Sequence, residues 1–291
     1  MRTIRALESV GLLENATWLD PVANKLRSVV KSVIRPQPLR DVLHGVPVGH
    51  PLHPLLILVP VGTWVSAAVL DVFPRTDGAA KILIGTGIAG AIPSALTGYT
   101  DWSETHEQQL RVGVVHSTAN LVGVVLYSLS LIERLAGRTG SGKALSFAGL
   151  AVVSAGGFLG GHLAYRQAVG ANHAEDVPHR ITPGWQGIGD LGDMPEGRLF
   201  RRTLGDIPLV VFRRGVEVSV LSDVCSHLSG PLHEGELTAD DDDPCVVCPW
   251  HQSTFSLRTG EVVHGPATSP QSSFLSRVVD GAVEVCLPNA G

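Results

Sequence analysis

The chain has 291 residues, of which 44% are hydrophobic, and its formal net charge at pH 7 is −5. Its mean hydropathy of +0.21 is high for a soluble protein of this length. Four cysteines are too few for a disulfide scaffold, and no basic stripe interleaved with aromatic residues points to nucleic acid as a partner.

Charge is divided unevenly along the chain. Residues 1–174 hold 14 Lys and Arg against 10 Asp and Glu, a net charge of +4, whereas residues 175–291 hold 8 against 17, a net charge of −9. This asymmetry predicts two modules, the first beside anionic membrane lipid and the second in water. We expect four regions, which are an N-terminal amphipathic segment (1–41), a membrane domain (42–170), a linker (171–184) and a second domain (185–291).

The N-terminal segment carries apolar side chains at helical spacing from Val22 to Val33, with Lys25, Arg27 and Lys31 among them. That pattern is typical of a basic amphipathic helix on a membrane surface. The alternative is a helix packed on the C-terminal domain. The segment lacks the short apolar core and the cleavage site of a signal peptide.

Four apolar runs without Asp, Glu, Lys or Arg follow, at 42–70, 82–100, 112–132 and 144–165. Each is long enough for a helix across a hydrocarbon core of about 30 Å, which takes about 20 residues. Prolines in the first run place the start of its helix near Pro54. Small residues at four-residue spacing, such as Gly156 and Gly160, favour close helix packing. We therefore predict a four-helix transmembrane bundle, rather than the buried helices of a soluble core.

Histidines gather at one end of these runs. Tracing the helices up and down places five of them near the same membrane face: His50, His53, His106, His116 and His162. Ionisable residues within spans are costly in lipid, so we expect a redox or metal site there. Haem b needs two axial imidazoles, for which we expect His116 with His162, and His53 as a substitute. A quinone pocket without metal and a hydrogen-bonded polar network are the alternatives.

Beyond the linker, short β-rich runs alternate with Gly, Asp and Pro. The runs at 208–212, 216–221, 255–257 and 282–287 predict an all-β domain. Four consecutive carboxylates, at 240–243, are expected to form a solvated loop or to steer a basic partner.

Two predicted loops of this domain each present a cysteine followed by a histidine, in Cys225-Ser226-His227 and Cys248-Pro249-Trp250-His251. A Rieske-type 2Fe-2S cluster has two thiolates on one iron and two imidazoles on the other. Each loop can therefore reach both irons. We predict that the cysteines bind one iron and the histidines bind the second.

Zinc is the competing metal, because Cys245 and Cys248 form a C-x-x-C pair with histidines on either side. Structural zinc motifs group a cysteine pair and then a histidine pair, whereas here each cysteine precedes its own histidine. We therefore expect Cys245 to lie in the strand before the second loop and Cys286 in the last strand.

Residues 185–288 resemble Rieske domains of the ferredoxin and oxygenase type, through these two loops and the Gly265-Pro266-Ala267 turn. Ser229 and Gln252 depart from the family pattern, because glycine is usual at both positions. This resemblance implies the 2Fe-2S cofactor and single-electron transfer.

High-potential Rieske proteins of cytochrome bc-type complexes carry an extra cysteine in each loop, joined as a disulfide. Gly230 and Trp250 stand at those places here. Ser253 matches a hydroxyl that hydrogen-bonds the cluster in that class, while Phe255 stands where that class has tyrosine. Because a donor near the sulfurs is lost, the resemblance implies an intermediate to low potential.

The membrane part is similar to an uncharacterised four-helix bacterial membrane family that is often found beside Rieske modules. The similarity rests on the HPLHP sequence at 50–54, on 97–101, on His116 with Asn120 and on Gly161-His162. It implies a multi-pass protein of the bacterial plasma (inner) membrane, and it brings no assigned reaction.

A Rieske oxygenase needs a further domain with a mononuclear iron site, and few residues follow the last predicted strand. We therefore expect an electron carrier or oxidoreductase subunit rather than an oxygenase. It would exchange electrons with a redox site among the helices, a partner protein or a quinone. The alternative is a membrane-anchored redox sensor or assembly subunit without a second redox centre. Positive charges flanking the spans predict that the Rieske domain is cytoplasmic.

Overall fold

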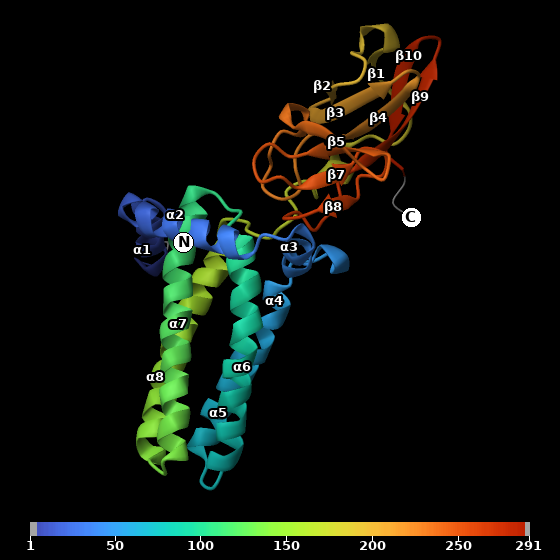
Figure 1. Cartoon of the computed structure of the whole chain (residues 1–291). Coiled ribbons are helices and arrows are strands. Elements are labelled where there is room, and N and C mark those ends of the chain that lie inside the picture. The colour runs from blue at the N-terminus through green and yellow to red at the C-terminus, as the bar shows by residue number, and fades with distance from the viewer. Residues whose placement is uncertain (1–4, 289–291) are drawn as a thin grey trace. The chain divides into compact units, whose positions relative to one another are not determined.

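The computed structural model describes residues 5–288, with side chains from residue 10, and divides into two units. The first comprises Met1–Arg35 and Pro51–Val169, and the second comprises Pro36–His50 and Gly170–Gly291. The first unit is helical, and the second contains all the strands (Figure 1).

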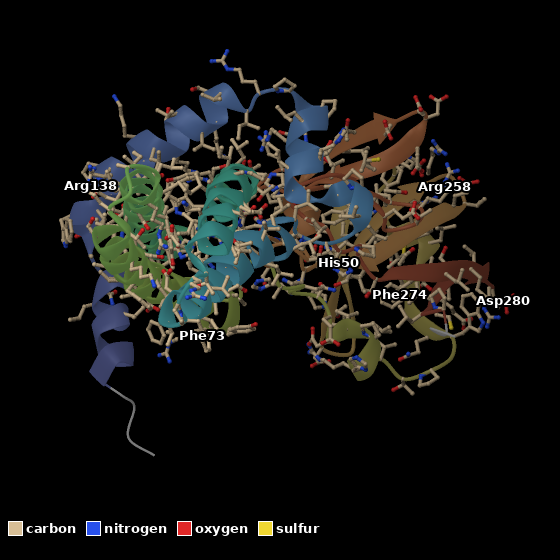
Figure 2. The ribbon with its side chains drawn as sticks, turned by 90° about the horizontal axis from the view of Figure 1, so that it is seen from below. His50, Phe73, Arg138, Arg258, Phe274 and Asp280 are labelled. Atoms are coloured by element: carbon tan, nitrogen blue, oxygen red, sulfur yellow. The ribbon has the colours of Figure 1, made fainter. Side chains whose placement is uncertain are left out.

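Four helices are long and apolar enough to cross a membrane: His53–Val72, Asp77–Trp102, Glu107–Leu135 and Thr139–Arg166. They are built from α4 (His53–Leu56), α5 (Leu58–Val72), α6 (Asp77–Trp102), α7 (Glu107–Leu135), α8 (Thr139–Gly161) and the π-helical turn η3 (His162–Arg166). The spans run side by side as an elongated bundle, which Figure 2 views from the end near Phe73 and Arg138. The predicted four-helix bundle is confirmed, and its first span begins next to the predicted Pro54.

The chain before the spans forms α1 (Arg5–Glu14), η1 (Thr17–Leu19) and α2 (Asp20–Val33). Ala23 and Leu26 of α2 pack with Trp102 and Leu110 at the ends of α6 and α7. α2 therefore belongs to the helical unit. Several valines on α2 remain exposed, as a helix on a membrane surface requires: Val22, Val29 and Val33.

A buried ion-pair cluster joins the spans at the other end of the bundle. The fully buried Arg134 of α7 bonds to Asp71 of α5 and, through Nη1, to Oδ1 of Asp77 at 2.7 Å. Lys143 of α8 donates to the carbonyl of Asp71 at 2.6 Å. Because a buried ion without a partner is strongly destabilising, this cluster holds all four spans in one arrangement.

Small residues let α8 approach α7 closely. A Cβ at Gly149 would lie 3.1 Å from the ring of Tyr127, and one at Gly156 would lie 2.8 Å from Oδ1 of Asn120. The close packing expected from glycines in this span is therefore present between α7 and α8.

The second unit contains two antiparallel sheets, with strand orders β1-β10-β9-β4-β3-β2 and β5-β6-β7-β8. The strands are β1 (Gln186–Asp190), β2 (Leu199–Leu204), β3 (Ile207–Arg214), β4 (Glu217–Ser222), β5 (Glu236–Asp240), β6 (Asp243–Val247), β7 (Thr254–Ser256), β8 (Val262–His264), β9 (Ser273–Val279) and β10 (Ala282–Cys286). Short helical turns are α9 (Val177–Arg180), η4 (Leu191–Asp193) and η5 (Leu232–Glu234). The all-β prediction is confirmed, with Cys245 in β6 and Cys286 in β10 as expected.

The acidic run at 240–243 forms the tight turn between β5 and β6. Its last residue, Asp243, accepts a hydrogen bond from the hydroxyl of Ser256 and pairs with Arg258.

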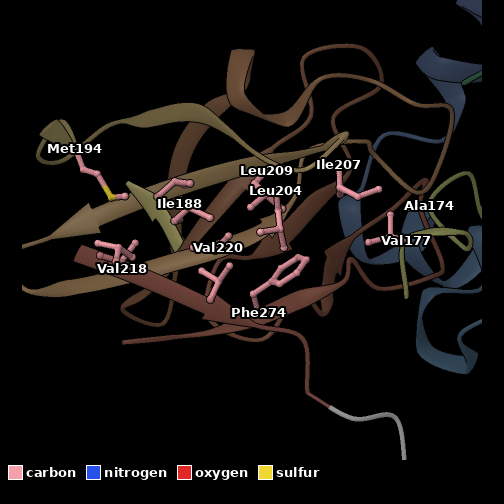
Figure 3. Close-up of a cluster of buried hydrophobic side chains, with 13 residues drawn as sticks. Ala174, Val177, Ile188, Met194, Leu204, Ile207, Leu209, Val218, Val220 and Phe274 are labelled. Carbon is pink, nitrogen blue, oxygen red and sulfur yellow. The ribbon is translucent and has the colours of Figure 1, made fainter. Parts of the chain in front are cut away.

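One core of the β domain is built on the six-stranded sheet. Leu209, Val220 and Phe274 are buried there with Ala174 and Val177 from the segment that precedes β1 (Figure 3). A second apolar cluster includes Phe255, Leu257 and both cysteines of the predicted cluster loops.

The segment 36–50 groups with the β domain, although it precedes the first span in sequence. It forms α3 (Gln37–His44) and η2 (Val46–Val48), and η2 packs beside β8 (Figure 1). The sequence analysis did not predict this packing.

Candidate functional site

The first predicted ligand loop is closed by two backbone hydrogen bonds around its cysteine. The Cys225 N–H donates to the carbonyl of Gly230, and the Ser229 N–H donates to the carbonyl of Cys225, both at 2.9 Å. Cys225 is buried inside this turn, and the side chain of His227 is half-buried.

The second loop repeats this pattern. The Cys248 N–H donates to the carbonyl of Ser253 at 2.8 Å, and the Gln252 N–H donates to the carbonyl of Cys248 at 3.1 Å. In both loops the partners therefore lie four and five residues after the cysteine. His251 is 7% exposed.

The fourth position after each cysteine has a left-handed backbone. Ser229 has φ 66° and Gln252 has φ 64°, a region that favours glycine. These are the two positions where the family resemblance leads one to expect glycine. Both positions therefore have the left-handed backbone typical of glycine, although neither residue is glycine.

The structure brings the four predicted ligands together as two like pairs. Cys225 and Cys248 lie in one apolar cluster, where the neighbouring Cys248 thiol raises the pKa of Cys225 and the Cys225 thiol lowers the pKa of Cys248 to about 7. The rings of His227 and His251 have centroids 5.1 Å apart and are nearly perpendicular, at 84°. A pair of thiols and a pair of imidazoles match the two ligands that each iron of a Rieske cluster requires, so the residues fit this cofactor.

Cys245, the additional cysteine of the possible zinc motif, lies in β6 and outside both ligand loops. The Cys245 thiol instead donates to the carbonyl of Asp243 at 3.4 Å.

The Cys248 thiol packs closely against the backbone of the first loop. A Cβ at Gly230 would lie 2.7 Å from Sγ of Cys248, so a larger residue cannot occupy that position without rearrangement. Phe255 is fully buried beside the two cysteines. The hydroxyl of Ser253 accepts a hydrogen bond from the Ala267 N–H at 3.0 Å, which ties the second loop to the turn at 265–267.

Sequence analysis missed two contacting segments, one at the first ligand loop and one at the turn 265–267. The His173 N–H, before β1, donates to the carbonyl of Ser226 at 2.9 Å. Asp41, in α3, accepts a hydrogen bond from the Gly265 N–H at 2.9 Å. The second contact joins residues 224 positions apart, and no pattern in a single sequence pairs residues over such a distance.

The membrane histidines separate into different environments. His53 in α4 and His116 in α7 have ring centroids 6.4 Å apart, at 82°. His53 Nδ1 is 2.8 Å from the carbonyl of Ser94, and His116 Nδ1 is 2.8 Å from the carbonyl of Gly156. Asn120 donates to the carbonyl of His116 at 2.9 Å.

The other three histidines have other partners or belong to the other unit. His162 Nε2 is 2.6 Å from Oε1 of Glu14 in α1. His106 caps the start of α7 together with Gln109. His50 is exposed and belongs to the unit that contains the β domain. The structure thus pairs His116 with His53 rather than with His162.

Comparisons with known proteins match both parts of the chain. The Rieske [2Fe-2S] domain model matches residues 184–278, and a family described as "Predicted membrane protein (DUF2231)" matches residues 49–173. The anthranilate 1,2-dioxygenase ferredoxin subunit of Burkholderia cepacia is 38% identical over 101 residues, which are 35% of this chain and 90% of that protein. The 3-phenylpropionate/cinnamic acid dioxygenase ferredoxin subunit of Escherichia coli (strain K12) is 34% identical over 100 residues, which are 34% and 91% of the two chains.

Among solved structures, the ferredoxin of carbazole 1,9a-dioxygenase from Nocardioides aromaticivorans IC177 is 23% identical. The match covers 36% of this chain and 98% of that one, with a TM-score of 0.33.

Proposed function

The chain belongs to the Rieske [2Fe-2S] family through residues 184–278, and from this premise we propose that it is a membrane-bound carrier of single electrons. The observation that carries the proposal is that two matching loops pair two cysteines in one apolar cluster and two imidazoles in ring contact. When bound, a 2Fe-2S cluster supplies one-electron redox chemistry. The four spans keep this chemistry at a membrane.

We assign each ligand a role on this basis. Cys225 and Cys248, buried in the apolar cluster, would hold one iron as thiolates. His227 and His251 would hold the second iron. Because imidazoles are neutral, they remove negative charge from the site and raise its potential relative to four thiolates.

Metal analysis of ligand variants tests the assignment. The purified chain should contain two iron atoms per molecule, as a 2Fe-2S cluster requires, and no stoichiometric zinc. Cys225→Ser and His251→Ala should lose the iron. Cys245→Ser, which changes a buried thiol outside the loops, should retain it. Full iron content in Cys225→Ser would refute the assignment.

For the redox site among the helices we propose His53 and His116, with haem b as the cofactor. A carbonyl oxygen can only accept a hydrogen bond, so each Nδ1 carries the hydrogen and each Nε2 keeps a lone pair. The Nε2 of His116 lies 3.3 Å from the amide nitrogen of Asn120, which a bound metal would displace. Metal-binding histidines are commonly oriented in this way by a backbone carbonyl. His53 therefore takes the place that the sequence analysis gave first to His162.

The distance between the two rings supports this choice. Two histidines that would hold one metal must lie close together, because a bond from a metal to an imidazole nitrogen is only about 2 Å long. The rings of His53 and His116 are 6.4 Å apart. A haem held there would add a second one-electron centre to the chain.

A reduced-minus-oxidised absorption spectrum of the purified chain tests the haem. We expect a b-type haem band that His53→Ala and His116→Ala abolish. His162→Ala, at a histidine bonded to Glu14, serves as the control and should keep the band. Absence of any haem band from the unaltered chain would overturn this proposal and favour a quinone pocket or a simple anchor.

The partner and the membrane complete the proposal. The matched relatives are ferredoxin subunits of dioxygenases, and this supports a protein redox partner for the present cluster. A quinone is the second candidate partner. We place the chain in the bacterial plasma membrane, with the Rieske domain on the cytoplasmic side.

A further inference from the structure

An acidic side chain of segment 36–50 holds the loop that follows β8. The Asp41 carboxylate accepts a hydrogen bond from the Gly265 N–H at 2.9 Å, and its second oxygen lies 3.0 Å from Nδ1 of His264. The Asp41 side chain is 13% exposed. Hydrogen bonds to an ionised carboxylate are stronger than those between neutral groups, so this contact is a specific anchor.

The backbone around this anchor is closely packed. His44 is 1% exposed. A Cβ at Gly265 would lie 3.2 Å from Cδ2 of His44 and 3.1 Å from Cγ2 of Val46. Segment 36–50 and the loop therefore fit together with little space between them.

The anchored loop reaches both cluster loops. The Ala267 N–H donates to the hydroxyl of Ser253 at 3.0 Å, and the carbonyl of Ser253 accepts the Cys248 N–H. The hydroxyl of Ser226 donates to the carbonyl of Ser269 at 2.7 Å. Residues 264–269 thus connect segment 36–50 to the loop of each cysteine.

We propose that Asp41 is a positioning residue for the cluster, which acts by fixing residues 264–269 and, through them, both ligand loops. Hydrogen bonding and solvent exposure around a 2Fe-2S cluster set its potential and electronic structure. This inference goes beyond the proposed function and holds whether or not the helices carry a haem. Segment 36–50 leads directly into the first span, so the chain that enters the membrane also supports the cluster loops.

Four versions of the full-length chain in detergent test the proposal. They are the unaltered chain, Asp41→Ala, Asp41→Asn and the control Asp280→Ala. Asp280 is an exposed carboxylate in the turn between β9 and β10, at the edge of the β domain (Figure 2). Amide hydrogen exchange of residues 264–269 and the electron paramagnetic resonance (EPR) spectrum of the reduced cluster are measured for each.

In Asp41→Ala we expect the Gly265 amide to exchange about tenfold faster or more, because it loses a charged acceptor. The g anisotropy of the cluster signal should also change. Asp41→Asn keeps an oxygen for this amide, so its exchange should be intermediate and its spectrum close to that of the unaltered chain. An effect seen in both variants is due to the lost charge. An effect seen only in Asp41→Ala is due to a changed position of the loop.

The proposal is overturned if Asp41→Ala leaves exchange and spectrum unchanged. It is also overturned if this variant loses thermal stability while its spectrum stays the same, since that is a purely structural role. If Asp41→Ala fails to assemble a cluster, amide exchange of the unaltered chain tests the anchor instead. Peptides covering 36–44 and 264–269 must then be protected, and complete exchange at the first time point would contradict the anchor.

Discussion

The conformation of single residues explains how the cluster loops tolerate an unusual sequence. Gln252 and Ser229 both adopt the left-handed backbone that glycine adopts without strain. A side chain in this region costs about 1–2 kcal/mol. Each loop therefore stores a small strain at the same place, four residues after its cysteine.

Replacing Gln252 with glycine should stabilise the β domain. The substitution relieves left-handed strain and adds some entropy to the unfolded chain, for an expected net gain of up to about 1 kcal/mol. Thermal unfolding of the iron-loaded chain measures it. Ser219→Gly in β4 is the control and should destabilise the domain, because a strand has no strain for glycine to relieve. A lower midpoint for Gln252→Gly would contradict the strain argument.

At the residue scale, ligand types were easier to predict than ligand partners in the membrane. The order of Cys and His in each loop pointed to a Rieske cluster without knowledge of the fold. The sequence predicts that the membrane histidines lie near one membrane face, but their pairing depends on how each helix is rotated about its axis. The ring of His53 packs directly against Gly98, where an added Cβ would lie 2.7 Å from His53 Nδ1. Hydropathy does not reveal a contact of this kind.

Among the elements, the spans are joined by the buried cluster around Arg134. Its side chain is fully buried between Asp71 and Asp77, which belong to two other helices. In contrast, Arg138 nearby pairs with Glu133 while its side chain is 59% exposed. The same type of ion pair thus occurs in a buried and an exposed setting at one end of the bundle.

Removal of the two arginines should have very different effects. Arg134→Ala leaves Asp71 as a buried charge without its guanidinium, and breaking such a pair costs about 3–5 kcal/mol. Arg138→Ala should cost less than about 1 kcal/mol, as exposed pairs do. Thermal unfolding in detergent, followed by helical circular dichroism, measures both. Equal losses in the two variants would show that Arg134 does not hold the spans together.

Elements with strong local periodicity were predicted well, and an element defined by distant contacts was not. Apolar runs located the four spans, and β-rich runs located β3, β4, β7 and β10. From the sequence, segment 36–50 is expected to lie just before the first span. In the structure it packs with the β domain through Asp41 and His44. Its partners come more than 200 positions later, so local pattern contains no sign of them.

For the whole molecule, the charges beside the spans predict the orientation. Because the number of spans is even, we expect both ends of the chain on one side, whose flanking segments carry Arg2, Arg5, Lys25, Arg27, Lys31, Arg35, Arg40, Arg111 and Arg166. The links on the other side carry Arg75, Lys81, Arg134, Arg138 and Lys143. Arg134 is also neutralised by its buried carboxylates. Because positive flanks stay inside, we expect a cytoplasmic Rieske domain.

Protease added to intact cells should therefore leave the Rieske domain uncut, while the same protease should cut it after the cells are opened. Detection with an antibody to the C-terminal domain distinguishes the two results. Cleavage in intact cells would reverse the orientation.

The central claim is that Cys225, His227, Cys248 and His251 hold a Rieske cluster in a membrane-bound chain. EPR of the purified, reduced full-length protein tests it most directly. Electron–nuclear double resonance on the same sample then detects the nitrogens that coordinate the cluster. We predict the signal of a one-electron-reduced 2Fe-2S cluster with couplings from two histidine nitrogens. A silent, zinc-containing protein, or a cluster signal without nitrogen couplings, would contradict the account.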